Sequence, residues 1–351
     1  MTVPTIDLAP GLTVSRLGFG AMAVSHVYGE TDPEQALRTL HHAVDEGITF
    51  LDTADVYGRP RPGTDGPAGT NEELVARLLA DRRAEVQVAT KFGITGLRPG
   101  PGGGASTRGD RAYPAQACEA SLRRLGVEVI DLYYLHRRSL DVPIEETVGA
   151  MAELVTAGKV RYLGLSEVTA DELRAAAAVH PIAAVQSEWS LWSRDVEAHV
   201  VPAAREVGAG FVPYSPLGRG FLTGAMTPEK IASGMLAAEP RFVEHFAANQ
   251  RAVQVVREVG EGIGATPAQV ALAWLLDRGD TLGLPVVPIP GTRSPARVTE
   301  NAGATAVRLD AAARGRLDAA ARGRLDEVAA LVRGGRNLSF AAPDWISAGR
   351  E

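Results

Sequence analysis

Short apolar runs alternate with longer amphipathic segments from residue 16 to residue 301, and this alternation restricts the possible folds more than any other feature. The runs that we expect to form strands are residues 17–20, 48–52, 86–91, 130–136, 162–166, 183–187, 211–214 and 285–289. Right-handed crossovers place each strand beside the preceding one, so eight strand-helix units close into a parallel barrel. The predicted fold class is therefore α/β, a (β/α)8 TIM barrel with long strand-end loops.

Helix boundaries can be read between these runs. The predicted starts are Asp32-Pro33, Thr70 and Thr266-Pro267, and the predicted ends are Gly47, Gly158 and Gly279. A doubly wound open sheet is the alternative, but it would require a glycine-rich dinucleotide fingerprint after the first strand, where the chain reads FGAMAVSHVYG. The length of 351 residues also permits two domains. We expect a single barrel domain over residues 1–351, with its core at about 16–301.

Three stretches break the regular spacing, at residues 59–69, 93–113 and 217–250, and each follows the C-terminal end of a strand. That end of a barrel carries the active site, so these loops are predicted to wall a pocket, although tolerated surface insertions are the alternative. The octapeptide LDAAARGR occurs twice in tandem over residues 309–324 and predicts a lengthened surface helix. Residues 334–351 should form a tail that packs over the barrel or stays mobile.

Composition excludes several classes of protein. The net charge of −6 argues against nucleic-acid binding, which depends on clustered Lys and Arg. We see neither a secretory signal nor an apolar run of membrane-spanning length, so a cytoplasmic protein without a membrane partner is expected. The single cysteine, Cys118, is predicted to be a buried structural thiol. No metal site is expected, and the oligomeric state stays open.

Polar side chains end three of the predicted apolar strands. Asp52 closes ITFLD, Lys91 closes VQVATK and His136 closes IDLYYLH, while Tyr57 follows Asp52 by five residues. Side chains at successive strand ends of a barrel converge near its axis. We expect Lys91 to lower the pKa of Tyr57 so that the phenol can protonate a carbonyl oxygen, with His136 orienting that oxygen. The pattern predicts carbonyl reduction, although a buried ion-pair network is the structural alternative.

The motifs GITFLDTADVYG, VATKFG and DLYYLH, in this order, resemble the aldo-keto reductase superfamily from about residue 6 to residue 301. The resemblance implies a (β/α)8 barrel, NADPH bound across its C-terminal face and a small-molecule carbonyl substrate. It assigns Asp52, Tyr57, Lys91 and His136 to catalysis. Ser166 and Gln186 match positions that bind the nicotinamide carboxamide. Glu167 stands where relatives often have Asn, and because an ionised carboxylate cannot donate to an amide oxygen, we leave it out of the site.

Two further segments match cofactor-binding positions. In VPYSPLGRGFLTG, Tyr214 is expected to stack on the nicotinamide, and the diphosphate is expected at Ser215, Leu217, Gly218 and Arg219. In PIPGTRSPARVTEN, a trap for the 2′-phosphate of NADPH and contacts to adenine are expected from Gly291, Thr292, Arg293, Ser294, Arg297, Glu300 and Asn301. Gly291 replaces the Lys of many relatives, so phosphate recognition falls to Arg293.

Other residues allow two interpretations. Trp189 is assigned to the substrate pocket, but Trp189 and Trp192 could equally pack beneath the loop at residues 217–250. Arg137 and Arg138 could attract an acidic substrate or be ordinary surface charges.

The function also has alternatives to carbonyl reduction. The same four catalytic residues could oxidise an alcohol or support a redox-assisted sugar rearrangement. The fold also serves as a non-catalytic, cofactor-binding regulatory subunit of channels, which the intact Tyr57 and Lys91 argue against.

Overall fold

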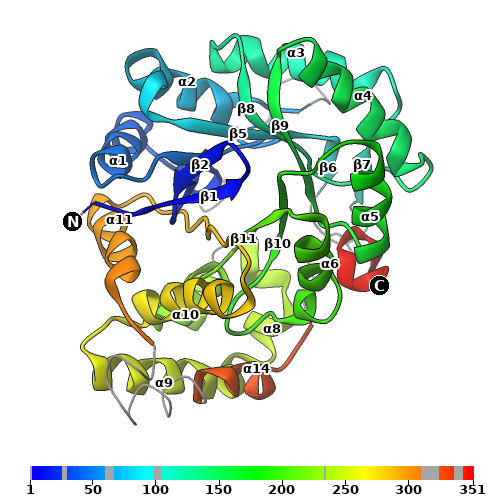
Figure 1. The fold of residues 1–351 in the computed structure, drawn as a ribbon. Coiled ribbons are helices and arrows are strands. Elements are labelled where there is room, and N and C mark those ends of the chain that lie inside the picture. Colours follow the sequence, from blue (N-terminus) through cyan, green and yellow to red (C-terminus); the bar gives the residue numbers. More distant parts are fainter. Residues whose placement is uncertain are drawn as a thin grey trace.

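The computed structural model describes residues 2–25, 30–59, 67–98, 104–232, 235–309, 324–335 and 343–351. Within these ranges, parallel strands form a sheet of seven in the order β11-β10-β9-β8-β5-β4-β3 (Figure 1). The strands are β3 (Phe19–Gly20), β4 (Phe50–Asp52), β5 (Gln87–Phe92), β8 (Ile130–Leu135), β9 (Val160–Ser166), β10 (Ala184–Glu188) and β11 (Gly210–Tyr214). Each strand pairs with the next along this order, as predicted.

The segment predicted as the eighth strand, residues 285–289, closes the sheet between β11 and β3. On one side the amide of Phe211 donates to the carbonyl of Pro285 at 2.8 Å. On the other side the amide of Gly18 donates to the carbonyl of Pro288 at 2.9 Å. Because proline has no N–H, the segment forms an isolated bridge rather than a regular ladder. The (β/α)8 barrel is confirmed, with an irregular last strand.

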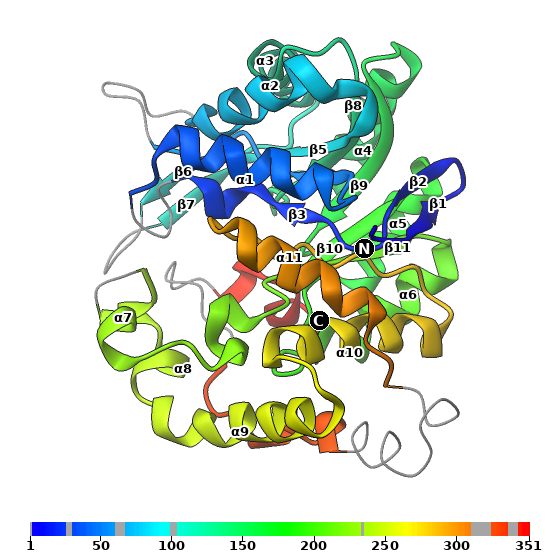
Figure 2. The ribbon, with the colours of Figure 1, turned by 90° about the vertical axis from the view of Figure 1, so that its left-hand side faces the viewer.

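Helices surround the barrel and alternate with its strands (Figure 1). The alternating helices are α1 (Pro33–Asp45), α2 (Thr70–Arg82), α3 (Tyr113–Leu125), α4 (Ile144–Thr156), α5 (Ala170–Val179), α6 (Val200–Val207), α10 (Pro267–Leu282) and α11 (Pro295–Gly303). Further helices are α7 (Pro228–Ala232), α8 (Pro240–Val243), α9 (Phe246–Ile263) and α14 (Val328–Leu331). Figure 2 shows α14 beside α9 at the edge of the molecule, where the two pack together.

Most predicted helix boundaries are confirmed. The Asp32 carboxylate caps α1, and Thr266 forms a capping box with Gln269 at the start of α10. Gly279 was predicted to end its helix, but α10 continues to Leu282 and ends at Gly283, which has a φ of 62°. Gly279 meets a packing requirement inside the helix, because a Cβ atom at this position would overlap Val286.

Two antiparallel ribbons were not predicted. The hairpin of β1 (Thr5–Ala9) and β2 (Leu12–Ser15) packs its apolar side chains against residues inside the barrel. The ribbon of β6 (Ile94–Arg98) and β7 (Gly104–Thr107) lies within residues 93–113, one of the three stretches predicted to be loops. The duplicated octapeptide at residues 309–324 lies almost entirely outside the described residues, so the surface helix predicted there stays a prediction.

The strand residues divide between two cores. Tyr133 points outward to the helices, whereas its neighbour Tyr134 fills the barrel interior. Gly164 on the next strand faces Tyr134, and a Cβ atom at Gly164 would overlap that ring. This dense interior leaves the strand ends as the place where polar side chains can gather.

Candidate active site

The four polar residues singled out in the sequence meet at the C-terminal ends of the strands. Asp52 is the last residue of β4, Lys91 lies near the end of β5, and His136 directly follows β8. The Lys91 ammonium donates to the Asp52 carboxylate at 2.5 Å and to the Tyr57 hydroxyl at 3.4 Å. The rings of Tyr57 and His136 meet edge to face, with centroids 5.6 Å apart. The structure therefore brings all four side chains into one cluster.

Asp52 and Lys91 form a buried ion pair at the base of this cluster. Burial raises the pKa of the Asp52 carboxyl, and Lys91 offsets part of that effect. Burial opposes charge on Lys91, but Asp52 and Tyr57 outweigh it and raise the pKa of the ammonium. Lys91 also donates to the Thr53 carbonyl at 2.8 Å, so the side chain is held from two directions.

The net shift of the Tyr57 pKa is upward, opposite to the shift that Lys91 alone would cause. The residue is partly exposed, but its hydroxyl is enclosed by protein, and burial raises the pKa above 10.0. Lys91 does lower the value, as expected, but burial has the larger effect. A sequence shows which charges are near but not how strongly a group is desolvated. Tyr57 consequently keeps its proton at neutral pH.

His136 is held in its neutral form. Burial lowers the pKa of its imidazole well below 6.5, and the positive charges of Lys91 and Arg137 lower it further. Its Nδ1 is shielded from solvent and makes no hydrogen bond with the described residues. A neutral imidazole can orient a carbonyl oxygen by hydrogen bonding but cannot serve as a cationic acid at neutral pH.

The residues predicted to bind nicotinamide border this cluster. Gln186 donates to the second oxygen of Asp52 at 2.8 Å, so it also holds the ion pair. Ser166 accepts a hydrogen bond from Arg137 at 3.0 Å. The hydroxyl hydrogen of Ser166 is therefore available for an acceptor such as a carboxamide oxygen, which fits the predicted role.

Glu167, which the sequence left out of the site, lies beside the predicted cofactor-binding residue Tyr214 and acts as a hydrogen-bond acceptor. Its carboxylate accepts from the Tyr214 hydroxyl at 2.8 Å, from the amide of Glu188 at 3.1 Å, and from the amide of Ser347 at 2.9 Å. Its φ of 50° is unusual for a residue other than glycine. Glu167 thereby fixes the hydroxyl of the predicted stacking ring, Tyr214, and ties it to the C-terminal tail.

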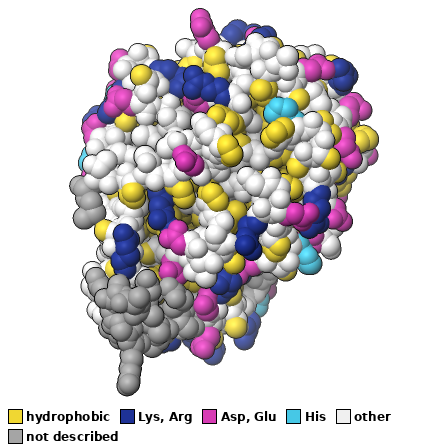
Figure 3. Space-filling model, in the orientation of Figure 1, with side chains coloured by type: hydrophobic (Ala, Val, Ile, Leu, Met, Phe, Trp, Pro, Cys, Tyr) yellow, Lys and Arg dark blue, Asp and Glu magenta, His cyan; other side chains and the backbone are white. Residues whose placement is uncertain are grey.

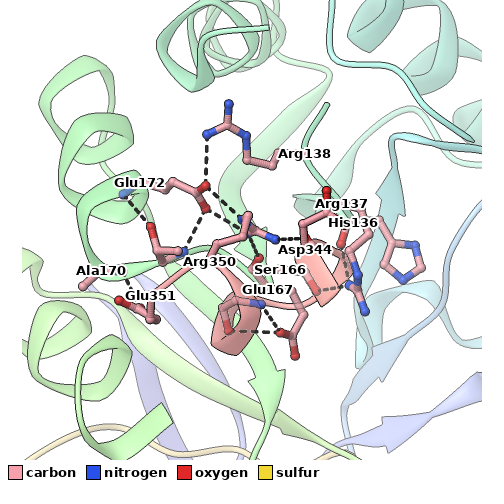
Figure 4. Close-up of polar contacts among 12 residues, drawn as sticks. His136, Arg137, Arg138, Ser166, Glu167, Ala170, Glu172, Asp344, Arg350 and Glu351 are labelled. Carbon is pink, nitrogen blue, oxygen red and sulfur yellow. Dashed lines mark hydrogen bonds and ion pairs between the residues drawn. The ribbon is translucent and has the colours of Figure 1, made fainter. Parts of the chain in front are cut away.

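The tail predicted for the C-terminus packs over the barrel in its described part, residues 343–351. Figure 4 shows Arg350 among residues that follow β9, where it donates to the Glu167 carbonyl at 2.5 Å and pairs with Glu172 at 3.0 Å. Glu351 accepts from the amide of Ala170 at 2.9 Å. No periodic pattern in the sequence predicts this docking, because it depends on isolated polar groups. The structure thus adds Glu167 and Ser347 to the surroundings of the candidate site.

The loop after β11 contains the predicted diphosphate residues Ser215, Leu217, Gly218 and Arg219. Ser215 and Arg219 have φ values of 49° and 54°, and the amide of Gly218 donates to the Ser215 carbonyl at 2.9 Å. Arg219 forms a buried ion pair with Glu239 at 2.9 Å. The loop is compact, and its arginine is already paired with a carboxylate.

The predicted phosphate trap lies at the start of α11. Gly291, Thr292, Arg293 and Ser294 precede the helix, and Arg297, Glu300 and Asn301 lie within it. The Thr292 hydroxyl accepts from the amide of Ser294 at 3.1 Å. Arg293 donates to the Glu30 carbonyl at 3.1 Å and is partly exposed. A Cβ atom at Gly291 would overlap the Gly20 carbonyl, which explains why no lysine occupies this position.

Trp189 does not lie in the predicted substrate pocket. Its side chain is fully buried, contacts Phe211 and Trp274 edge to face, and donates to Glu197 at 2.9 Å. Residues just past a strand end can turn outward toward the helices, and the sequence does not show that turn. Trp192 packs beneath the loop after β11, because a Cβ atom at Gly218 would overlap its ring.

Other features carry no chemistry in the described part of the chain. Cys118 is buried on α3, and burial raises its pKa to about 12, so the thiol is a structural one. The described residues contain no group of three or more metal-binding side chains and no helix that could cross a membrane. On the face shown in Figure 3, acidic and basic side chains are interspersed.

Comparison with known proteins finds relatives that match most of this chain. The sequence profile described as "Aldo/keto reductase family" matches residues 16–322. A protein of Glycine max named "Probable aldo-keto reductase 1" is 46% identical over 303 residues, which cover 85% of this chain and 83% of that protein.

Solved structures agree with the sequence comparison. A glycerol dehydrogenase from Gluconobacter oxydans is similar with a TM-score of 0.80 and 28% identity, covering 97% of this chain and 100% of the other. A thermostable aldo-keto reductase in complex with the inhibitor epalrestat gives a TM-score of 0.70 and 25% identity, covering 93% and 99% of the two chains.

Proposed function

Since the chain belongs to the aldo/keto reductase family and is thus an oxidoreductase, we propose that it reduces an aldehyde or ketone to an alcohol with NADPH, using Tyr57 as the proton donor. The observation that supports this most directly is the contact of the Tyr57 hydroxyl with Lys91, beside a neutral His136. When bound, the cofactor supplies a hydride to the carbonyl carbon. The cytoplasmic location stays a prediction from the sequence.

Each residue of the cluster has a distinct role in the proposed reaction. Tyr57 releases its hydroxyl proton to the carbonyl oxygen, and the Lys91 ammonium stabilises the phenolate that remains. Asp52 keeps Lys91 charged and in place. His136, being neutral, donates a hydrogen bond to the same oxygen and orients it.

Cofactor groups are assigned by position and chemistry. Ser166 and Gln186 would hold the carboxamide, Tyr214 would stack on the ring, and the loop from Ser215 to Arg219 would face the diphosphate. Arg219 would then have to exchange or share its contact with Glu239. NADPH oxidation over a panel of aldehydes and ketones tests the proposal, and a complete lack of turnover with every carbonyl would contradict it.

Arg293 should decide the choice between NADPH and NADH. We expect Arg293→Met to raise the KM for NADPH about 10- to 100-fold, as expected for a lost hydrogen bond to a charged group, and to leave the KM for NADH nearly unchanged. Arg38→Met, which removes an exposed arginine on α1, is the matched control. If the KM values for NADPH and NADH changed equally, Arg293 would not determine the choice between the two cofactors.

The pH dependence should differ between the two directions of the reaction. Because the pKa of Tyr57 is raised and that of His136 is lowered, neither group changes protonation around neutral pH. The kcat for reduction should therefore show no titration near pH 6.5, whereas alcohol oxidation, which needs the Tyr57 phenolate, should rise toward alkaline pH. pH profiles of kcat in both directions measure this, and a step near pH 6.5 in reduction would contradict the neutral state of His136.

A further inference from the structure

Arg137 and Arg138, which the sequence leaves equivalent, differ sharply in the structure. Arg138 forms an ion pair with Glu172 at 3.0 Å and donates to the Val142 carbonyl at 3.1 Å. Arg137 makes no ion pair with any residue that the structure describes. Its Nη1 donates to the His136 carbonyl at 2.7 Å and to Ser166 at 3.0 Å. Both acceptors are neutral, so the positive charge of Arg137 has no counterion there.

The charge of Arg137 is also buried. The residue is 7% exposed, and its Nε is shielded from solvent and makes no hydrogen bond within the described part of the chain. The Trp345 ring of the C-terminal tail lies 5.5 Å from the guanidinium and covers it. Burial of a cation without a counterion costs free energy, so such a group usually serves a purpose other than stability.

Arg137 lies at the reaction centre rather than at a remote site. It follows His136 in the chain and contacts Ser166, and its charge acts on both Tyr57 and His136. Figure 4 shows Arg137 beside His136 and Ser166, apart from the ion pairs of Glu172.

The ionic groups near Arg137 already have other partners. Lys91 is neutralised by Asp52, and the Glu167 carboxylate accepts from Tyr214, Glu188 and Ser347.

We propose that Arg137 determines substrate specificity by binding an anionic group, so that the preferred substrate is an aldehyde or ketone that carries a carboxylate. This inference rests on the proposed reductase function. The carboxylate would supply the missing counterion, and guanidinium donors match its geometry. The Trp345 ring would exclude water from the pair, which strengthens it.

The first test compares carbonyl substrates that carry a carboxylate with related neutral ones. The pairs are 4-carboxybenzaldehyde with its methyl ester and 4-oxobutanoate with butanal, each assayed with NADPH. Wild-type kcat/KM should favour the acid of each pair by about tenfold or more. Arg137→Met should reduce kcat/KM for the acids about 10- to 100-fold more than for their neutral partners. Arg138→Met is the matched control and should preserve the preference.

Two results of this assay would overturn the proposal. One is a wild-type preference for the neutral partners. The other is an equal loss for acids and neutral compounds in Arg137→Met, which would mean that Arg137 only orients Ser166 or the fold.

A binding measurement separates this proposal from the reductase function itself. Calorimetric titration of benzoate and benzamide, with and without NADP+, requires no turnover. Benzoate should bind more tightly than benzamide to the wild type and to Arg138→Met, and Arg137→Met should lose the difference. If this pattern appears while no carbonyl is reduced, the reductase function fails and the anion site stands. Equal binding of benzoate and benzamide to the wild type would refute the anion site.

Discussion

Tyr57→Phe should lower kcat for carbonyl reduction by about 100- to 10,000-fold, the range expected for loss of a general acid. The substitution removes only the hydroxyl that contacts Lys91 at 3.4 Å, and the ring can keep its edge-to-face contact with His136. Folding and cofactor affinity should therefore be nearly unchanged. Steady-state kinetics, together with fluorescence titration of NADPH, measure both properties.

A matched control exists on α3. Tyr113 is also partly buried, and its ring contacts Phe92 and Arg108, but it lies outside the cluster. Tyr113→Phe should keep kcat within about twofold, since surface changes away from key contacts have small effects. If Tyr57→Phe retained most of the wild-type kcat, another group would have to supply the proton.

Lys91→Met should damage both activity and stability. Lys91 is fully buried, and its removal leaves the Asp52 carboxylate without its cation. Breaking a buried ion pair from one side costs about 3–5 kcal/mol, and the phenolate of Tyr57 loses its stabilising charge. We expect a lower free energy of unfolding in urea and a kcat reduced about 100-fold or more.

The double variant Asp52→Asn/Lys91→Met separates the two effects. It removes both charges, so much of the lost stability should return, while kcat should stay low. If the double variant recovered activity as well, Lys91 would serve the fold rather than the chemistry. If Lys91→Met unfolded no more easily than the wild type, the ion pair would have no net role in stability.

Local patterns predicted most of the fold because each depends on neighbours in the chain. Alternating apolar runs predicted the strands, and Asp32 and Thr266 predicted helix starts through hydrogen bonds to amides a few residues away. Predictions that depended on distant packing were less successful. Gly279 lies inside α10, where Val286 leaves no room for a Cβ atom, and the hairpin of β1 and β2 was not predicted.

The candidate site shows the same division. Parallel strands must place Asp52, Lys91 and His136 at one end of the barrel, so the sequence alone could predict their meeting. Trp189 was misplaced because its direction depends on the turn after β10, which brings it against Trp274.

By itself, the sequence determined the order of the strands, the residues at their ends and the kind of chemistry those residues can perform. Only the tertiary structure decided their electrostatic states, because desolvation depends on everything that surrounds a group. Burial reversed the expected net shift of the Tyr57 pKa and keeps His136 neutral. Tertiary contacts also gave Arg138 a carboxylate partner, whereas Arg137 has none among the residues that the structure describes, a difference that two adjacent arginines in a sequence cannot show.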